Sequence, residues 1–208
     1  MNCGLCGSET TVFSTIKKRI YYHCNHCDGI SLHQDFFLSK EQEKERYQAH
    51  NNDLADPGYQ NFVSPIVHAV VQDYKKTDTG LDFGSGSAPI VASMLQEKTY
   101  NITTYDPFFD PKTHVLDNTY NYITCCEVME HFYYPKKEFA LLYSLLKEKG
   151  SLYCKTYLYD PSIDFDTWWY KNDNTHVFFY TKKTLDWIKN HFNFSQVNST
   201  ATLIVFKK

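Results

Sequence analysis

The sequence has no long apolar run and no excess of basic residues. No stretch approaches the roughly 20 consecutive apolar residues that a membrane-spanning helix needs, so we expect no membrane partner. There are 21 Lys and Arg residues against 24 Asp and Glu residues. Because the resulting net charge is −3, we do not expect nucleic acid to be the main partner. The first residues, MNCGLCGSET, lack the basic-then-apolar order of a signal peptide, which favours a cytoplasmic protein.

The length of 208 residues suits one medium-sized domain, or a domain of about 150 residues with a small module. Hydrophobic residues at 42% and charged residues at 22% are typical of a globular protein. Aromatic residues are abundant at 17%, which is compatible with a ring-lined site for a small molecule.

Four of the seven cysteines have the spacing of a metal site. They form two C-x2-C pairs, Cys3 with Cys6 and Cys24 with Cys27, separated by 17 residues. This pattern is typical of four thiolates around Zn²⁺. Disulfides are the alternative, which a cytosolic setting disfavours, and the adjacent His23 and His26 are alternative donors. Four thiolates close the coordination shell, so we expect a structural zinc.

A charged segment follows the cysteine module. Residues 40–53, KEQEKERYQAHNND, favour an exposed helix, and Asp56-Pro57-Gly58 predicts a turn. From Tyr59 to about Lys75, apolar residues recur every three or four positions, as in an amphipathic helix. The predicted organisation is a zinc ribbon at 1–38, a helical linker at 39–58 and a larger domain at 59–208.

Strand and helix patterns alternate in the larger domain. The expected strands are 81–83, 101–106, 121–126 and 151–157, the expected helices are 88–97, 135–148 and 181–190, and strands near 192–198 and 201–206 close the chain. This alternation predicts an α/β domain with a doubly wound, Rossmann-like parallel sheet and an antiparallel last strand inserted into it. The remaining cysteines, Cys125, Cys126 and Cys154, lie in apolar runs and are expected to be buried.

The loop after the first of these strands, in TGLDFGSGSAPI, has the glycine spacing of a nucleotide-binding turn. Gly84 and Gly86 fit a Gly-x-Gly-x-x-Gly fingerprint, but the third position is Pro89, which removes a backbone donor for a diphosphate. Asp82 would repel a diphosphate and suits a cationic ligand instead. S-adenosylmethionine is such a ligand. A plain tight turn is the alternative, because short glycine motifs are weak signals.

A second acidic residue ends the next strand. Asp106 lies 20 residues after Gly86, at the spacing known for recognition of ribose hydroxyls. Phe108 and Phe109 follow it and are candidates to flank an adenine ring.

These motifs resemble those of class I S-adenosylmethionine-dependent methyltransferases. LDFGSGSAP resembles the first motif of that family, TTYDPFF the second, and YNYITCCEVMEHFYYP the fourth-strand motif, and the resemblance spans about residues 55 to 206. The four-cysteine ribbon ahead of this domain resembles the architecture of sugar C-methyltransferases. A third glycine common in the family's loop is Ala88 here, and Asp117 is a weak candidate for the family's adenine-side acid.

The resemblance implies a cofactor site. The residues that it assigns to S-adenosylmethionine are Asp82, Gly84, Ser85, Gly86, Asp106, Pro107, Phe108, Cys126 and Glu127, the last two at the methionine end.

Two histidines are the candidates for catalysis. His131 follows the fourth strand and is either a general base or a residue that positions the loop. Glu130 is expected to bond the backbone at that turn, with a catalytic carboxylate as the alternative. His176 lies in a long aromatic segment, YLYDPSIDFDTWWYKNDNTHVFFYTKKTLDWI, whose length predicts a lid or binding loop. His176 resembles a histidine of quinone-type O-methyltransferases, as a base or a pocket wall.

The predicted function is methyl transfer from S-adenosylmethionine to a hydroxyl or activated carbon of a sugar- or quinol-like metabolite. An RNA or protein methyltransferase that uses the ribbon, with its Lys17-Lys18-Arg19 cluster, as a grip is one alternative. A non-catalytic module that binds the cofactor is another, and a nicotinamide enzyme is the third. The oligomeric state is open.

Overall fold

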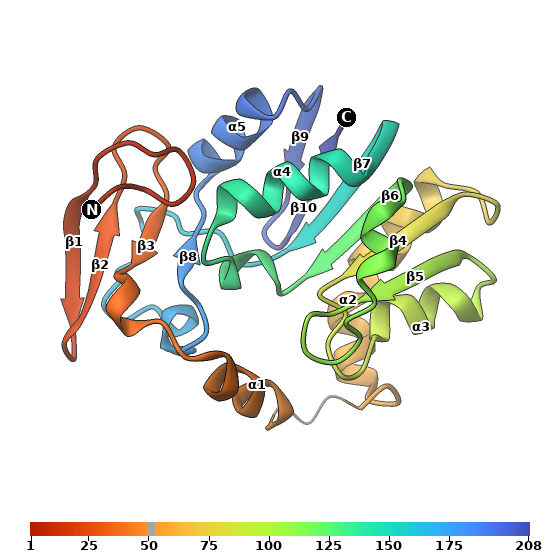
Figure 1. Cartoon of the computed structure of the whole chain (residues 1–208), viewed down its shortest axis with the longest axis horizontal. Helices are drawn as coiled ribbons and strands as arrows, with labels where there is room; N and C mark the ends of the chain where they lie inside the picture. The colour runs from red at the N-terminus through yellow and green to blue at the C-terminus, as the bar shows by residue number, and fades with distance from the viewer. Residues whose placement is uncertain (50–52) are drawn as a thin grey trace.

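The computed structural model describes residues 1–49 and 53–208 and arranges them around two β-sheets (Figure 1). A small sheet is built mostly by the N-terminal module, and a larger mixed sheet carries the rest of the chain. Among these residues, no helix has both the length and the apolar character of a membrane span.

The large sheet has six strands in the order β5-β4-β6-β7-β10-β9. They are β4 (Thr79–Phe83), β5 (Asn101–Tyr105), β6 (Tyr120–Cys126), β7 (Leu146–Lys155), β9 (Gln196–Ser199) and β10 (Leu203–Lys207). Strands β5, β4, β6 and β7 are parallel, and β10 lies antiparallel between β7 and β9. The predicted Rossmann-like sheet with an inserted antiparallel last strand is confirmed.

Helices cover both faces of this sheet. The helices are α1 (Lys40–Gln48), α2 (Pro57–Asp73), α3 (Ile90–Glu97), α4 (Pro135–Leu145) and α5 (Lys182–His191), with short 3-10 turns η1 (Gln34–Phe36), η2 (Thr113–Asp117), η3 (Met129–His131) and η4 (Trp169–Asn172). Successive residues of β6 point to opposite faces, so Tyr122 packs with α2 and α3, whereas Ile123 packs with α4 and α5.

The small sheet has four strands, and one of them comes from the far end of the chain. Strands β1 (Thr11–Ile16), β2 (Arg19–His23) and β3 (Ile30–Leu32) form an antiparallel ribbon, and β8 (Phe178–Phe179) extends it by pairing with β3. The long aromatic segment therefore closes the N-terminal sheet, which the sequence did not predict. Phe178 lies directly over Gly29, where a side chain would be 2.4 Å from its ring.

Several element boundaries differ from the prediction. Asp56 is the N-cap of α2 and accepts from the Gly58 amide, so Asp56-Pro57-Gly58 begins a helix rather than forming a separate turn. Helix α4 ends at Leu145, and β7 begins at once with an irregular pairing to β6. Helix α1 ends at Gln48, and residues 50–52 of the predicted helix lie outside the described residues.

Candidate active site

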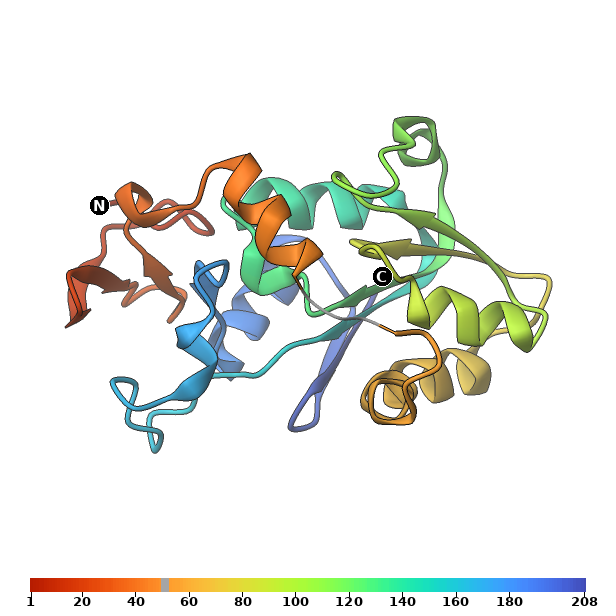
Figure 2. The same ribbon diagram turned by 90° about the horizontal axis from the view of Figure 1, so that it is seen from below.

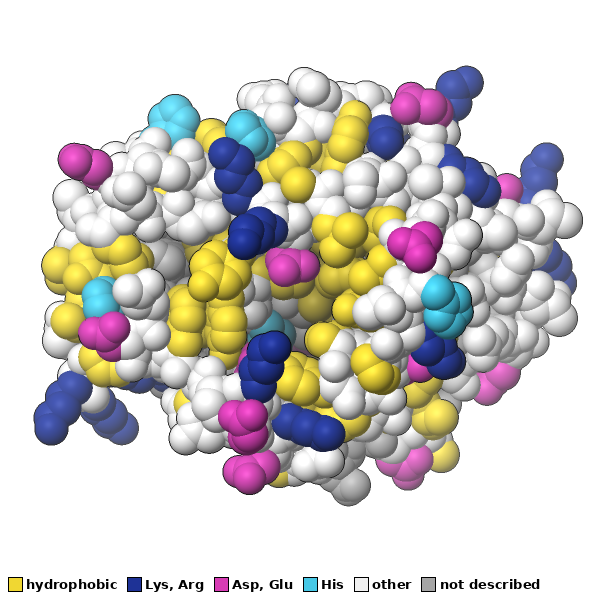
Figure 3. Space-filling model, viewed as in Figure 1, with side chains coloured by type: hydrophobic (Ala, Val, Ile, Leu, Met, Phe, Trp, Pro, Cys, Tyr) yellow, Lys and Arg dark blue, Asp and Glu magenta, His cyan; other side chains and the backbone are white. Residues whose placement is uncertain are grey.

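One pocket of about 990 Å³ opens at the carboxyl edge of the large sheet. The loops that follow β4, β5 and β6 line it, as expected for ligand sites of parallel sheets. Figure 3 shows a hollow at the centre of this face, with hydrophobic side chains around it and basic side chains at its rim. The pocket brings together the eleven predicted cofactor and catalytic residues: Asp82, Gly84, Ser85, Gly86, Asp106, Pro107, Phe108, Cys126, Glu127, His131 and His176.

The glycine loop needs both of its glycines for backbone reasons. Gly84 and Gly86 have φ of +74° and +68°, a region that residues with a Cβ rarely adopt. A Cβ on Gly84 would also lie 2.6 Å from a methyl of Val128, whereas a Cβ on Gly86 would enter open space. The amides of Gly84 and Ser85 donate to the Tyr105 carbonyl, which holds the loop against β5.

Asp106 holds the glycine loop and the turn after β5 together. One carboxylate oxygen accepts from the Gly86 amide at 2.9 Å, and the other accepts from the amides of Phe108 and Phe109 at 2.8 and 3.0 Å. The carboxylate is buried yet borders the pocket. Asp106, whose spacing from Gly86 predicted ribose recognition, thus also connects the glycine loop directly to the turn after β5.

Asp82 lies beneath the loop, with 3% of its surface exposed. It accepts from the Thr124 hydroxyl at 2.7 Å and from the Ala92 amide at 3.3 Å. Burial raises the pKa of Asp82 to about 6, although these two hydrogen bonds oppose the rise. Asp117, in contrast, is exposed at the end of η2 and is not among the described residues that line the pocket.

A buried polar cluster lies past the end of β6. The Tyr170 hydroxyl bonds to Glu130 Oε1 at 2.5 Å, to Glu127 Oε2 at 3.2 Å and to the Thr156 hydroxyl at 2.8 Å. Glu130 was expected to bond the backbone, but its side chain instead accepts from the hydroxyl of Tyr170, which lies in η4. Burial, followed by the Glu130 charge, raises the pKa of Glu127 to about 9.

The contact between Glu130 and Tyr170 joins residues that are 40 positions apart in the sequence. No local motif predicts such a tertiary contact, so the place of Glu130 in a buried cluster could not be predicted from the sequence. The aromatic segment divides here: Trp169 and Tyr170 line the pocket, whereas Trp168 packs into the cluster beneath the small sheet.

The two candidate histidines lie side by side in the pocket wall. Their ring centroids are 4.9 Å apart, although one comes from η3 and the other precedes β8. Nδ1 of His131 lies 3.0 Å from the Thr175 carbonyl, and Nδ1 of His176 lies 2.7 Å from the Tyr170 carbonyl. Burial lowers the pKa of His176, which favours its neutral form.

Helix α1 also lines the pocket, which the sequence did not predict. Lys40, Glu43, Arg46 and Tyr47 face the pocket, and Glu43 is buried rather than exposed. Arg46 binds the Asp173 carboxylate at 2.7 Å and so ties α1 to the segment after η4. The sequence contains one sign of this role: Glu43 and Tyr47 are four residues apart and so lie on one helical face, where they bond to each other at 2.8 Å.

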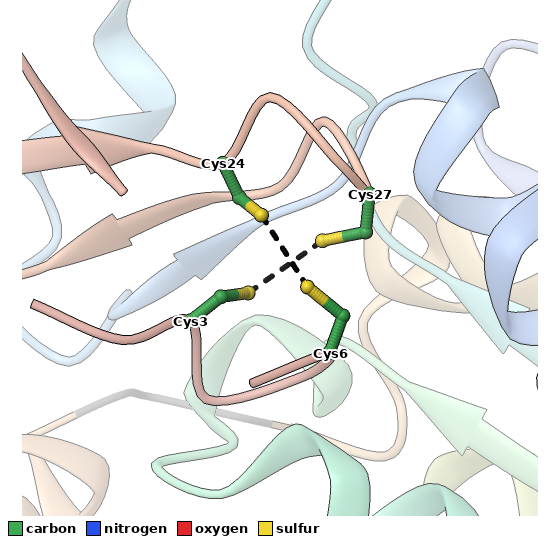
Figure 4. A group of neighbouring side chains, drawn as sticks. All are labelled: Cys3, Cys6, Cys24 and Cys27. Atoms are coloured by element: carbon green, nitrogen blue, oxygen red, sulfur yellow. Dashed lines mark hydrogen bonds between the residues drawn. The ribbon is translucent and has the colours of Figure 1, made fainter. Parts of the chain in front are cut away.

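The four cysteines of the N-terminal module converge on one point (Figure 4). The Sγ atoms of Cys3 and Cys27 are 3.5 Å apart, and those of Cys6 and Cys24 are 3.3 Å apart, so all four are free thiols rather than disulfides. Bonds of about 2.3 Å to a tetrahedral zinc would separate the sulfurs by about 3.8 Å, close to this arrangement. The donor set therefore fits zinc. His23 pairs with Asp28 instead.

The cysteine module packs directly on the large domain. Cys3, Leu5, Cys24 and Cys27 belong to the same buried cluster as residues of α4 and α5. The Thr181 hydroxyl, which caps α5, donates to the Asp28 carboxylate at 2.9 Å. Figure 2 shows the module beside the long aromatic segment, with α1 running from the module toward the large sheet.

Solved structures share this fold. A Burkholderia thailandensis 1,6-didemethyltoxoflavin-N1-methyltransferase, with its methyl acceptor and S-adenosylhomocysteine bound, is 13% identical, with a TM-score of 0.57 over 97% of this chain and 99% of its own. An Archaeoglobus fulgidus S-adenosylmethionine-dependent methyltransferase is 14% identical, with a TM-score of 0.55 over 82% of this chain and 100% of its own.

A third similar structure is larger. A Haemonchus contortus phosphoethanolamine N-methyltransferase, with phosphomonomethylethanolamine and S-adenosylhomocysteine bound, is 13% identical, with a TM-score of 0.52 over 64% of this chain and 38% of its own. At these identities the similarity shows the fold alone. No curated protein sequence matches the chain.

The sequence itself matches a family profile. The profile described as "Methyltransferase domain" matches residues 54–199. This range includes all the residues that line the pocket except those of α1. The chain therefore belongs to the methyltransferase domain family, which confirms the enzyme class that its sequence predicted, an S-adenosylmethionine-dependent methyltransferase.

Proposed function

We propose that the pocket holds S-adenosylmethionine along the carboxyl edge of β4, β5 and β6 and transfers its methyl group to a small molecule. The proposal rests on one observation above all: the glycine loop, Asp106 and both histidines line a single pocket. The loop of Gly84, Ser85 and Gly86 would receive the cofactor, and Asp106 would accept from the ribose hydroxyls. Asp82 would supply negative charge near the cationic methionine end.

The acceptor would lie on the opposite side of the pocket. His131, His176, Trp169 and Tyr170 form this wall, which offers aromatic surfaces and polar groups together. Such a wall suits a sugar- or quinol-like metabolite with a hydroxyl or activated carbon. Small acceptors bound to the toxoflavin and phosphoethanolamine enzymes are consistent with a small acceptor here. The enzyme would chiefly align the acceptor oxygen or carbon with the methyl group and exclude water.

We further propose that the four cysteines hold a structural Zn²⁺. The fit of the four thiols and their burial against α4 and α5 support this assignment. Cys6→Ser is expected to lower the zinc content measured by elemental analysis, whereas Cys126→Ser, a change outside the cluster, should not. An unchanged zinc content in Cys6→Ser would contradict the four-thiolate site.

Calorimetric titration with S-adenosylhomocysteine tests the cofactor assignment, with NAD as the control ligand. We expect S-adenosylhomocysteine to bind and NAD not to bind. Asp106→Ala should weaken S-adenosylhomocysteine binding by about tenfold or more, because the buried carboxylate both holds the loop and accepts from the ribose. Asp110→Ala is the matched control, since this neighbouring carboxylate bonds to Thr104 and Lys112 instead. Normal binding by Asp106→Ala would contradict the ribose assignment, and binding of NAD alone would contradict the cofactor.

A further inference from the structure

Three side chains of the types that commonly bind metal ions lie close together at the acceptor wall of the pocket. Glu130, His131 and His176 each place one potential ligand atom within 4.8 Å of the other two. Two of them come from η3, and the third comes from the segment before β8. Two imidazoles and one carboxylate are a donor set that suits divalent first-row transition ions.

The hydrogen bonds of both histidines occupy Nδ1 and leave Nε2 free to bind a metal ion. Nδ1 of His131 donates to the Thr175 carbonyl, and Nδ1 of His176 donates to the Tyr170 carbonyl, because a carbonyl can only accept. In the neutral ring this places the lone pair on Nε2. Metal-binding histidines are commonly fixed in this way by a backbone carbonyl on the other nitrogen.

Glu130 has an unsatisfied oxygen. Its side chain is completely buried, Oε1 accepts from the Tyr170 hydroxyl, and Oε2 has no hydrogen-bond partner among the described residues. A buried carboxylate oxygen without a partner is costly, so a cation or a proton donor is expected to meet it. His131 forms no hydrogen bond to this carboxylate: its Nε2 lies 3.9 Å from Oε1, beyond hydrogen-bond distance, and no partner of Oε2 is found among the described residues.

We propose that Glu130, His131 and His176 form a divalent metal site that binds an oxygen of the methyl acceptor, an inference that rests on the proposed function. Both histidines line the pocket and Glu130 lies behind them, so coordination positions would remain open toward the acceptor. An acceptor hydroxyl bound there would lose its proton to water more readily. The resulting oxygen would form the new O–CH3 bond while the S–CH3 bond breaks and its electron pair stays on sulfur.

Cobalt binding tests this site without any need for a known acceptor. The full chain is first loaded with one equivalent of Zn²⁺, which the four soft thiolates take up in preference to nitrogen and oxygen ligands, and is then titrated with Co²⁺. We expect one further Co²⁺ per chain, with weak visible bands and no thiolate charge-transfer absorption, because the ligands are nitrogen and oxygen. Cobalt that entered the cysteine site would show that charge-transfer band, so the two sites are distinguishable.

Variants then assign the site. His131→Ala should weaken Co²⁺ binding by about tenfold or more, and Glu130→Gln, which retains a side-chain oxygen for Tyr170, should do the same if the first variant folds poorly. His68→Ala is the matched control, because His68 is exposed on α2 and does not line the pocket. Absence of the second Co²⁺, or wild-type binding by both folded variants, would overturn the proposal. Titration of the same samples with S-adenosylhomocysteine tests the cofactor assignment separately.

Discussion

Alanine substitutions at Gly84 and Gly86 of the glycine loop should have different consequences. Gly84→Ala forces a Cβ into the left-handed backbone region, at a cost of about 1–2 kcal/mol. The same Cβ would lie 2.6 and 2.7 Å from the two methyl groups of Val128, and relief of such overpacking costs about 1–3 kcal/mol more. Gly86→Ala has only the first penalty, because no atom lies within 4 Å of its Cβ.

Thermal unfolding and cofactor titration measure the two effects separately. For a chain of this size, about 1 kcal/mol corresponds to roughly 2–4 °C in Tm. We therefore expect Gly84→Ala to lower Tm by roughly 4–20 °C and Gly86→Ala by roughly 2–8 °C. Affinity for S-adenosylhomocysteine should show a large loss in Gly86→Ala, since the open space beside Gly86 is part of the pocket.

Two results would refute this reasoning. An unchanged Tm for Gly84→Ala would mean that the loop and the Val128 turn are not in close contact. Normal affinity of Gly86→Ala for S-adenosylhomocysteine would mean that the cofactor does not pass over this glycine.

Three further predictions test other parts of the structure. Gly29→Ala should destabilise the chain by about 1–3 kcal/mol through its contact with Phe178, and Phe178→Leu should reduce that loss in a double-mutant cycle; additive effects would contradict the contact. Because ionised Asp82 is expected to attract the cationic cofactor and its pKa is about 6, affinity for S-adenosylmethionine should fall below pH 6 by up to about tenfold per pH unit, and a slope that persists in Asp82→Asn would assign it to another group. Arg46→Ala removes the contact between α1 and Asp173 and should accelerate dissociation of S-adenosylhomocysteine in stopped-flow measurements, with Lys44→Ala on the same helix as the control. Equal dissociation rates for Arg46→Ala and the unaltered chain would mean that this contact does not retain the ligand.

The sequence predicted the parts of the molecule that depend on local pattern. Alternating apolar segments located the strands of the large sheet, and the glycine spacing located a loop whose φ angles require glycine. Asp106 was identified by its distance along the chain from Gly86, and the two residues are hydrogen-bonded in the structure. In each case residues near in sequence, or at equivalent ends of parallel strands, determine the geometry.

Contacts between distant segments were not predictable in this way. Helix α1 has a charged sequence that indicates an exposed linker, but its Glu43 and Tyr47 line the pocket, and its Arg46 binds a carboxylate 127 positions later. Strand β8 has only two residues, too short for a periodic pattern, and its place is decided by pairing with β3. Such placements depend on tertiary packing, about which a single sequence contains little information.

The ribbon and the acceptor wall form one structural unit. The Leu32 amide at the end of β3 donates to the Val177 carbonyl, and the Val177 amide donates to the Glu130 carbonyl. His176 therefore sits between the N-terminal sheet and η3, one residue from both hydrogen bonds. The four cysteines join the loop between β2 and β3 to the segment before β1. A zinc ion bound by them would therefore stabilise the acceptor wall rather than the glycine loop, which is held by β5 and Asp106. This separation would account physically for a four-cysteine ribbon ahead of the methyltransferase domain.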